Sequence, residues 1–176
     1  MKRHKYIFPS YLFVTVLGVL LHFLYDWSGQ NPVVGIFSAV NESTWEHLKL
    51  IFFPFLLLTL WEFFTKHQGD DHFLPARLAG ILSAMAFTVI AFYTYSGVLG
   101  KNVDIVNISI FFLAVVIGFW TEKKVYGKAG LLSPQVAASV FLVILFLFFI
   151  FTFTPPDIGL FEEPDAASMK TFFFRQ

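Results

Sequence analysis

The sequence contains no cysteine, which excludes disulfides, thiolate nucleophiles and cysteine-ligated metal ions. Charged residues are also scarce, at 14% of the chain, whereas a soluble domain carries about a quarter. The formal net charge is zero and no long basic tract is present, so nucleic acid is excluded as a partner. The chain shows no internal repeat, low-complexity linker or soluble domain. These absences leave an integral membrane protein as the class that fits the composition.

Apolar residues make up 57% of the sequence and fall in long unbroken runs. A helix needs roughly 20 mostly apolar residues to cross about 30 Å of hydrocarbon, and several stretches approach that length. The run 141–151 does not alternate residue by residue, as a strand of a membrane barrel would. We therefore predict an all-α, polytopic membrane protein, with a single transmembrane domain over 1–176. Its helices, about five in number, are expected at about 6–26, 42–65, 77–97, 104–122 and 131–154.

The segment 33–40 lies between the first two expected helices and is apolar but too short to span a membrane. It is expected to form a short re-entrant or interfacial segment. Either placement would hold the ends of the two helices close together.

Lysine and arginine concentrate in cytoplasmic loops, so their distribution predicts the orientation of the helices. A cytoplasmic N-terminus places eight of these residues inside and four outside. The inner set is Lys2, Arg3, Lys5, Lys66, Arg77, Lys123, Lys124 and Lys128, and the outer set is Lys49, Lys101, Lys170 and Arg175. We predict a multi-pass protein of the plasma membrane with its C-terminus outside. Membrane lipids are the expected partners, and homo-oligomers stay an open alternative.

Polar and ionisable side chains gather at the expected outer ends of the first two helices. Ionisable residues are costly inside a membrane and usually mark function. His22 and Asp26 share a face of the first helix at i and i+4, as do Glu42 and Glu46 near the start of the second. The whole group comprises His22, Asp26, Asn41, Glu42, Ser43, Glu46, His47 and Lys49, with Asp157 joining from the C-terminal segment.

Three interpretations of this group stay open from the residues alone. The first is a metal site for zinc or another divalent cation, in which His22, Asp26, Glu46 and His47 are the ligands and Glu42 is a catalytic base. The second is a buried structural network that pairs Glu46 or Glu42 with Lys49 and His22 with Asp26. The third is a ligand pocket. The residues expected to contribute to either the structural network or the ligand pocket are Asn41, Ser43, Lys49 and Asp157.

The stretches HFLYDWSGQNPVVGIFSAV, NESTWEHLKLIFFPFLL and TPPDIGLFEEP resemble a family of small bacterial integral membrane proteins of unknown function. This resemblance covers nearly the whole chain and implies a compact multi-helix membrane fold. In that family we expect a histidine after the proline pair, where this chain has Asp157. A weaker similarity is to transmembrane hydrolases such as alkaline ceramidases and adiponectin-type receptors, whose Ser-x-x-x-His element is matched by Ser43 and His47. Their later histidine pair is absent, because no histidine follows His72.

Three functions follow from these patterns. The first is an extracytoplasmic polar pocket that binds a small ligand, a metal or a lipid headgroup. The second is a membrane-embedded, metal-dependent hydrolase acting on a lipid or a lipid-linked substrate. The third is a small transporter or scaffold subunit, which a polar path through the bundle to Glu62 would favour. The sequence leaves open whether the protein is an enzyme and which metal, if any, it binds.

Overall fold

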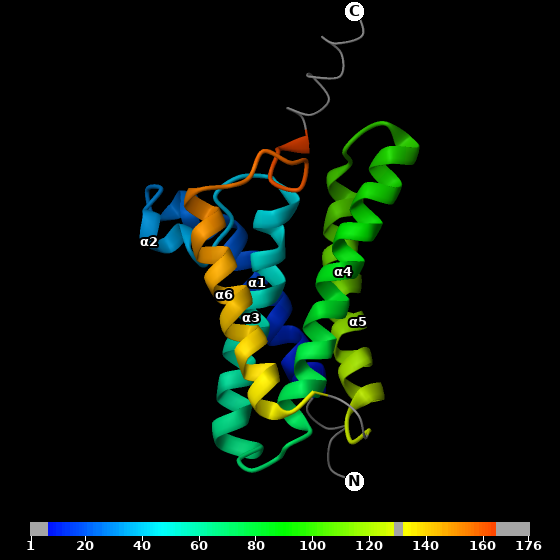
Figure 1. Cartoon of the computed structure of the whole chain (residues 1–176). Coiled ribbons are helices and arrows are strands. Elements are labelled where there is room, and N and C mark those ends of the chain that lie inside the picture. The colour runs from blue at the N-terminus through cyan, green and yellow to red at the C-terminus, as the bar shows by residue number, and fades with distance from the viewer. Residues whose placement is uncertain (1–6, 129–131, 165–176) are drawn as a thin grey trace, which may run out of the picture.

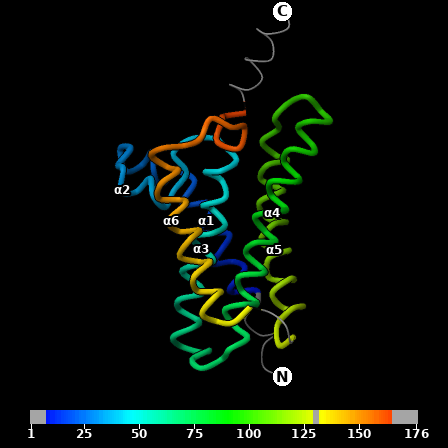
Figure 2. The backbone as a smooth tube through the Cα atoms, in the orientation of Figure 1, coloured from blue at the N-terminus to red at the C-terminus, as the bar shows by residue number. Residues whose placement is uncertain are grey.

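The computed structural model describes residues 7–128 and 132–164 and places five long helices in an antiparallel bundle (Figures 1 and 2). These are α1 (Ile7–Trp27), α3 (Thr44–Lys66), α4 (Phe73–Leu99), α5 (Asp104–Val125) and α6 (Pro134–Phe153). Each is long and apolar enough to cross a membrane, and the described residues form no strand. The predicted all-α fold with about five membrane helices is therefore confirmed.

A short helix, α2 (Pro32–Gly35), follows α1, where a re-entrant or interfacial segment was expected. Asn31 caps it by accepting a hydrogen bond from the backbone N–H of Val33, and Pro32 occupies its first position. Proline suits that position because the N–H it lacks would have no partner inside the helix. The same arrangement starts α6, where Ser133 is the cap and Pro134 follows. The expected start at 131 lies outside the described residues.

Besides α6, which begins at Pro134, two helices begin at positions that differ from the expected ones. The third begins at Thr44 and not at 42, because the hydroxyl of Ser43 accepts a hydrogen bond from the N–H of Glu46 and so caps it. The fourth begins at Phe73 and not at 77. Pro75 is tolerated in its first turn, where backbone N–H groups have no helical partner in any case.

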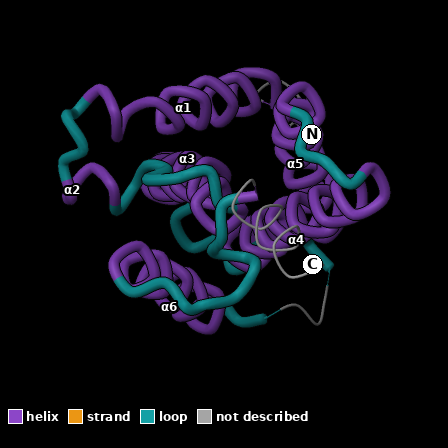
Figure 3. The backbone as a smooth tube through the Cα atoms, turned by 90° about the horizontal axis from the view of Figure 1, so that it is seen from above, coloured by secondary structure: helices purple, strands orange, loops and turns teal. Residues whose placement is uncertain are grey.

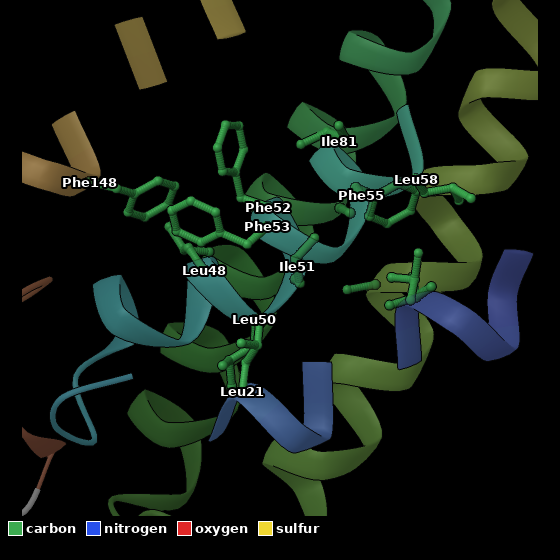
Figure 4. Close-up of a cluster of buried hydrophobic side chains, with 14 of the residues drawn as sticks. Leu21, Leu48, Leu50, Ile51, Phe52, Phe53, Phe55, Leu58, Ile81 and Phe148 are labelled. Carbon is green, nitrogen blue, oxygen red and sulfur yellow. The ribbon is translucent and has the colours of Figure 1, made fainter. Parts of the chain in front are cut away.

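Helix α3 is the centre of the bundle and lies between α1 and α6 when viewed from above (Figure 3). Of the 18-residue apolar stretch of α3 that could cross the membrane, 61% is buried inside the protein, compared with 17% of the corresponding stretch of α6. Phenylalanine rings fill the space between α3 and α6, where Phe52 and Phe53 meet Phe148 at centroid distances of 5.2 and 5.8 Å (Figure 4). The large side chains of α3 therefore form the core around which the other helices pack.

Helices α4 and α5 approach closely through small residues. A Cβ atom at Gly80 would lie 2.5 Å from the carbonyl oxygen of Gly118, and one at Gly118 would lie 3.3 Å from the Cβ of Ala84. Ala114 is also fully buried, one turn before Gly118. Small residues four positions apart on both helices let the backbones touch, which is the usual packing of membrane helices.

A buried ion cluster joins α3, α4 and α5 near the end of the bundle where α3 finishes. The guanidinium of Arg77 donates to Glu62 at 2.5 Å and to Glu122 at 2.8 Å, and the side chain of Arg77 is only 2% exposed. Phe73 and Phe119 lie beside this guanidinium, 5.1 and 5.9 Å from its carbon. Each buried charge therefore has an opposite partner, as a low-dielectric interior requires.

Candidate metal centre

Three ionisable side chains meet at the end of the bundle where α1 finishes and α3 begins. His22 comes from the last turns of α1, Glu42 from the loop before α3 and His47 from the first turn of α3. Nε2 of His47 lies 3.4 Å from one Glu42 oxygen, and Nε2 of His22 lies 4.0 Å from the other. One ligand atom from each residue lies within 4.8 Å of the other two. We call His22, Glu42 and His47 the triad.

The helix backbone fixes the ring of His47. Its Nδ1 lies 2.9 Å from the carbonyl oxygen of Ser43, one turn earlier. A carbonyl oxygen can only accept, so Nδ1 carries the hydrogen and Nε2 is the nitrogen that faces Glu42 and His22. Orienting a histidine through its second nitrogen is typical of metal ligands. The Ser-x-x-x-His spacing, noted above as similar to that of transmembrane hydrolases, has a structural cause here: Ser43 caps α3, and its carbonyl oxygen orients His47.

Two imidazoles and one carboxylate face one another in the triad. The buried Nδ1 of His22 has no hydrogen-bond partner in the described part of the chain. The imidazole of His47 holds the pKa of the Glu42 carboxyl below its ordinary value; partial burial opposes this shift, while the charges of His47 and His22 add to it. Glu42 is therefore ionised at neutral pH. A carboxylate facing two imidazole nitrogens is stabilised by a cation or a proton among them.

Glu46, expected as a ligand, points away from the triad. Its Oε2 accepts hydrogen bonds from Nζ of Lys49 at 2.6 Å and from the N–H of Val40 at 2.9 Å. Lys49 also donates to the carbonyl of Gly35 at 2.9 Å and is fully buried. The pair therefore fastens α2 and the loop after it onto α3. This is the Glu46–Lys49 contact that the structural-network interpretation expected.

The remaining candidates lie around the triad and not in it. Asp26 is exposed one turn beyond His22, and its charge acts on that ring from a distance. Ser43 is the cap of α3, and the side chain of Asn41 accepts from the N–H of Ser43. Asp157 is exposed and does not line the cavity described below. The structure thus brings together three of the predicted side chains and gives the others different surroundings.

The triad forms part of the wall of a cavity of about 740 Å³ between α1, α3, α4 and α5. Apolar side chains from the four helices make most of its surface, including Phe23, Ile51, Phe92 and Ile108. Polar residues gather at the level of the triad and include Thr44, Asn102, Asp104, Asn107 and Glu163. Binding sites for small molecules commonly have such an apolar body with a few polar groups.

Residues 155–164, which we call the strap, run from the end of α6 over this end of the bundle (Figure 1). The N–H of Trp45 donates to the carbonyl of Leu160 at 2.9 Å, and the hydroxyl of Tyr93 donates to the carbonyl of Gly159 at 2.8 Å. The ring of Phe161 packs against Trp45 at 4.8 Å. The strap therefore connects α3 to α4, and it ends with Glu163 and Pro164 on the cavity wall.

A family model described as a family of unknown function, DUF6512, matches residues 1–169. The chain belongs to this family. The match confirms the resemblance of nearly the whole sequence to an uncharacterised family. No curated protein and no solved structure matches this DUF6512 chain. Its site is therefore interpreted from its own geometry.

Two features of this DUF6512 chain were not identified from the sequence. One is the Arg77 cluster, since Arg77 was considered only as a marker of orientation. The other is the contribution of Asn102, Asp104 and Glu163 to the cavity. Because the helices alternate in direction, the start of α5 and the end of α6 lie at the same end of the bundle as the triad. The order of the helices in the sequence could therefore have indicated that these residues lie near it. The spacing of Glu62 and Arg77 across one short loop gave a weaker indication of the cluster.

Proposed function

We propose that this chain is a membrane-embedded hydrolase that uses a divalent transition-metal ion, with zinc as the expected metal. The triad carries this proposal, because two imidazoles and a carboxylate lie within 4.8 Å of one another on a cavity wall. Catalytic zinc sites have three protein ligands of these types and leave a position for water or substrate. Structural zinc sites are instead closed by four protein ligands.

The arrangement suits the hydrolysis of an ester or an amide. A metal ion bound there would polarise the substrate carbonyl and lower the pKa of its water to about 7. The water oxygen bonds to the carbonyl carbon, and the bond from that carbon to the alcohol oxygen or amine nitrogen breaks. The departing group gains a proton, and the products are an acid and an alcohol or amine. Asp104 and Glu163, on the same cavity wall, are the carboxylates available for proton transfer.

The interior of the bundle argues against transport. The cavity and the Arg77 cluster lie toward opposite ends of α3, α4 and α5. On α4, the buried residues between Arg77 and Thr88 are Leu78, Gly80, Ile81 and Ala84, all of them apolar. On α5, the buried residues between the cavity and Glu122 are Ala114, Val115 and Gly118. The buried hydroxyls of Thr15 on α1 and Thr59 on α3 donate to carbonyls of their own helices. An ion or a polar solute would pass the apolar side chains of α4 and α5 only at a high cost in desolvation.

Metal analysis tests the proposal. The full chain is purified in mild detergent, loaded with zinc and desalted, and the metal content per chain is measured. Wild type should retain about one ion per chain, as expected for one three-ligand site. The variant His47→Gln should bind zinc more than about tenfold more weakly, since even changes to supporting groups cost about 10–100-fold.

The matched control is His72→Gln, at an exposed histidine beside the start of α4. It should retain metal as wild type does, and both variants should unfold at the wild-type temperature when metal-free. A wild-type protein without zinc, or equal loss in the two variants, would contradict the proposal. Cleavage of a p-nitrophenyl acyl ester, abolished by chelator and restored by zinc, would then identify a hydrolase. Metal binding without turnover would instead identify a non-catalytic pocket.

A further inference from the structure

The depth and the openings of the cavity point to a class of substrate. We infer that the cavity holds the acyl chain of a lipid from the leaflet at the triad end, which reaches the triad sideways between α1 and α5. The ester or amide of that lipid then lies at the triad. The inference rests on the proposed function for the chemistry at the triad, while the acyl-chain site depends on the cavity alone.

The cavity reaches about as deep as one leaflet. Its lining on α1 includes Gly18, and α1 ends at Trp27. This distance is about 13 Å along the axis at about 1.5 Å per residue. Half of the hydrocarbon core is about 15 Å thick. The floor of the cavity is therefore near the middle of the membrane, as a chain from one leaflet requires.

Gly18 closes the cavity at this depth. A Cβ atom there would lie 2.6 Å from the carbonyl oxygen of Leu50 and 2.6 Å from the ring of Phe111. Helices α1, α3 and α5 thus meet in direct contact at the floor. A bound chain would end at this contact and would not extend into the opposite leaflet.

The side of the cavity between α1 and α5 is open to lipid. Val19 and Phe23 on α1 line the cavity and are also 41% and 44% exposed. Ile108 and Phe112 on α5 do the same, at 52% and 37% exposed. Each pair lies one turn apart, so the four side chains form the two edges of a lateral opening. In a membrane, apolar side chains at these positions contact acyl chains.

The strap covers part of the water-facing end of the cavity, whereas the side chain of Glu42 in the triad is 66% exposed there. The strap is held to the first turn of α3 through Leu160 and to α4 through Gly159, and it reaches the cavity at Glu163. A lipid from the bilayer can therefore reach the triad through the lateral opening without moving the strap, while water reaches the triad from the end of the bundle at Glu42.

The polar part of the cavity selects among lipid headgroups. Its lining contains the carboxylates Glu42, Asp104 and Glu163 and no lysine or arginine within the described residues. A phosphate headgroup would face like charge from Asp104 and Glu163 even with a metal ion at the triad. The lining therefore favours a neutral or cationic lipid whose hydroxyl or amine groups donate hydrogen bonds.

Photocrosslinking in lipid nanodiscs tests this site. The probe is a monoacylglycerol with a diazirine in its long acyl chain, and the labelled peptides are identified by mass spectrometry. Wild type should be labelled on cavity-lining residues of α1 and α5. The variant Ile108→Trp should reduce that labelling about tenfold. The larger indole would occupy the opening and remove the contacts of one or two methylene groups of the acyl chain, which weakens binding by about that factor.

Ile105→Trp is the matched control, since Ile105 is 68% exposed on the same helix but does not line the cavity. Val19→Trp and Val16→Trp form a second pair on α1, where Val16 is exposed and does not line the cavity. Labelling that is spread over all lipid-facing surfaces, or that falls equally within either pair, would overturn the inference. The variant His47→Gln should keep the cavity labelling. A wild-type protein that retains no metal but is labelled in the cavity would reject the proposed function alone, and a wild-type protein that retains metal without cavity labelling would reject the acyl-chain site alone.

Discussion

Glu42 and Glu46 are one helical turn apart in sequence but have different surroundings because α3 begins between them. A helix starting at 42 would place both carboxylates on one face. Ser43 instead caps the helix, so Glu42 stands outside it and can reach His47 and His22. Glu46, inside the first turn, is 3% exposed and faces Lys49. We therefore assign Glu42 to the proposed metal and Glu46 to the packing of the loop.

This assignment predicts opposite effects for one substitution at the two positions. Glu42→Gln should weaken zinc binding by more than about tenfold without changing the thermal unfolding of the metal-free protein. Glu46→Gln should retain zinc but lower the free energy of unfolding by about 3–5 kcal/mol, because Lys49 keeps its buried charge without a compensating anion. Metal content and thermal unfolding in detergent, measured on both variants, check the two effects.

The reverse pattern, with zinc lost from Glu46→Gln and stability lost from Glu42→Gln, would restore the ligand set expected from the sequence. Residue types and spacing were enough to predict that His22 and His47 share one end of the bundle. They could not identify the participating carboxylate, because a displacement of α3 by two residues decides which side chain reaches the triad. That displacement depends on a single cap, Ser43.

At the scale of helices, two kinds of packing hold the bundle together. Phenylalanine rings separate α3 from α6, whereas Gly80 and Gly118 bring α4 and α5 into backbone contact. Helix α5 is therefore held by α4 at Gly80 and by α1 at Gly18. These two contacts set the distance between α1 and α5, on which the proposed acyl-chain site depends.

Replacing Gly80 with alanine should separate α4 from α5. The added Cβ would lie 2.5 Å from a backbone oxygen, which cannot turn aside as a side chain can. We expect a loss of about 1–3 kcal/mol in the free energy of unfolding, as for other overpacked positions. Gly97→Ala, on the same helix with no atom within 4 Å of the new Cβ, should be neutral or slightly stabilising. Equal thermal unfolding of the two variants would contradict the close contact.

The number of membrane helices was predictable because their apolar runs are long and uninterrupted. Their ends were less so: the fourth helix was expected from 77 but begins at Phe73, because a proline in the first turn, here Pro75, costs no helical hydrogen bond. The packing partners were not predictable from apolar content alone. The small residues that indicate close packing are Gly80, Ala84, Ala114 and Gly118. Their pattern can be interpreted only once α4 and α5 are known to be neighbours.

At the scale of the whole molecule, the orientation in the membrane stays a prediction from the positive charges. Among the described residues, Arg77 and Lys49 are buried in ion pairs and contribute little to a loop's charge. When Arg77 is left out of the inner set and Lys49 out of the outer set, the described residues leave one positive charge, Lys101, at the outer end. The inner end keeps four, which are Lys66, Lys123, Lys124 and Lys128. The bias toward a cytoplasmic position for the loops after α3 and α5 thus persists.

Reporter fusions after Gln68 and after Gly127 should both score as cytoplasmic. The two positions follow α3 and α5, which run in the same direction (Figure 1), so the reporters should agree with each other whichever way the protein is oriented. Agreement on an extracytoplasmic position would reverse the orientation, and with it the leaflet that supplies the lipid. Disagreement would show that the number of membrane helices is wrong.

X-ray absorption at the zinc edge, on the full chain loaded with one equivalent of zinc in detergent, tests the metal site most directly. With no cysteine in the sequence, His22, His47 and Glu42 should give a shell of nitrogen and oxygen neighbours at about 2.0–2.2 Å. Outer-shell scattering should fit two imidazole rings in wild type and in His72→Gln, and one ring in His47→Gln. An all-oxygen shell in wild type, or the same number of imidazoles in wild type and His47→Gln, would contradict a metal centre at the triad.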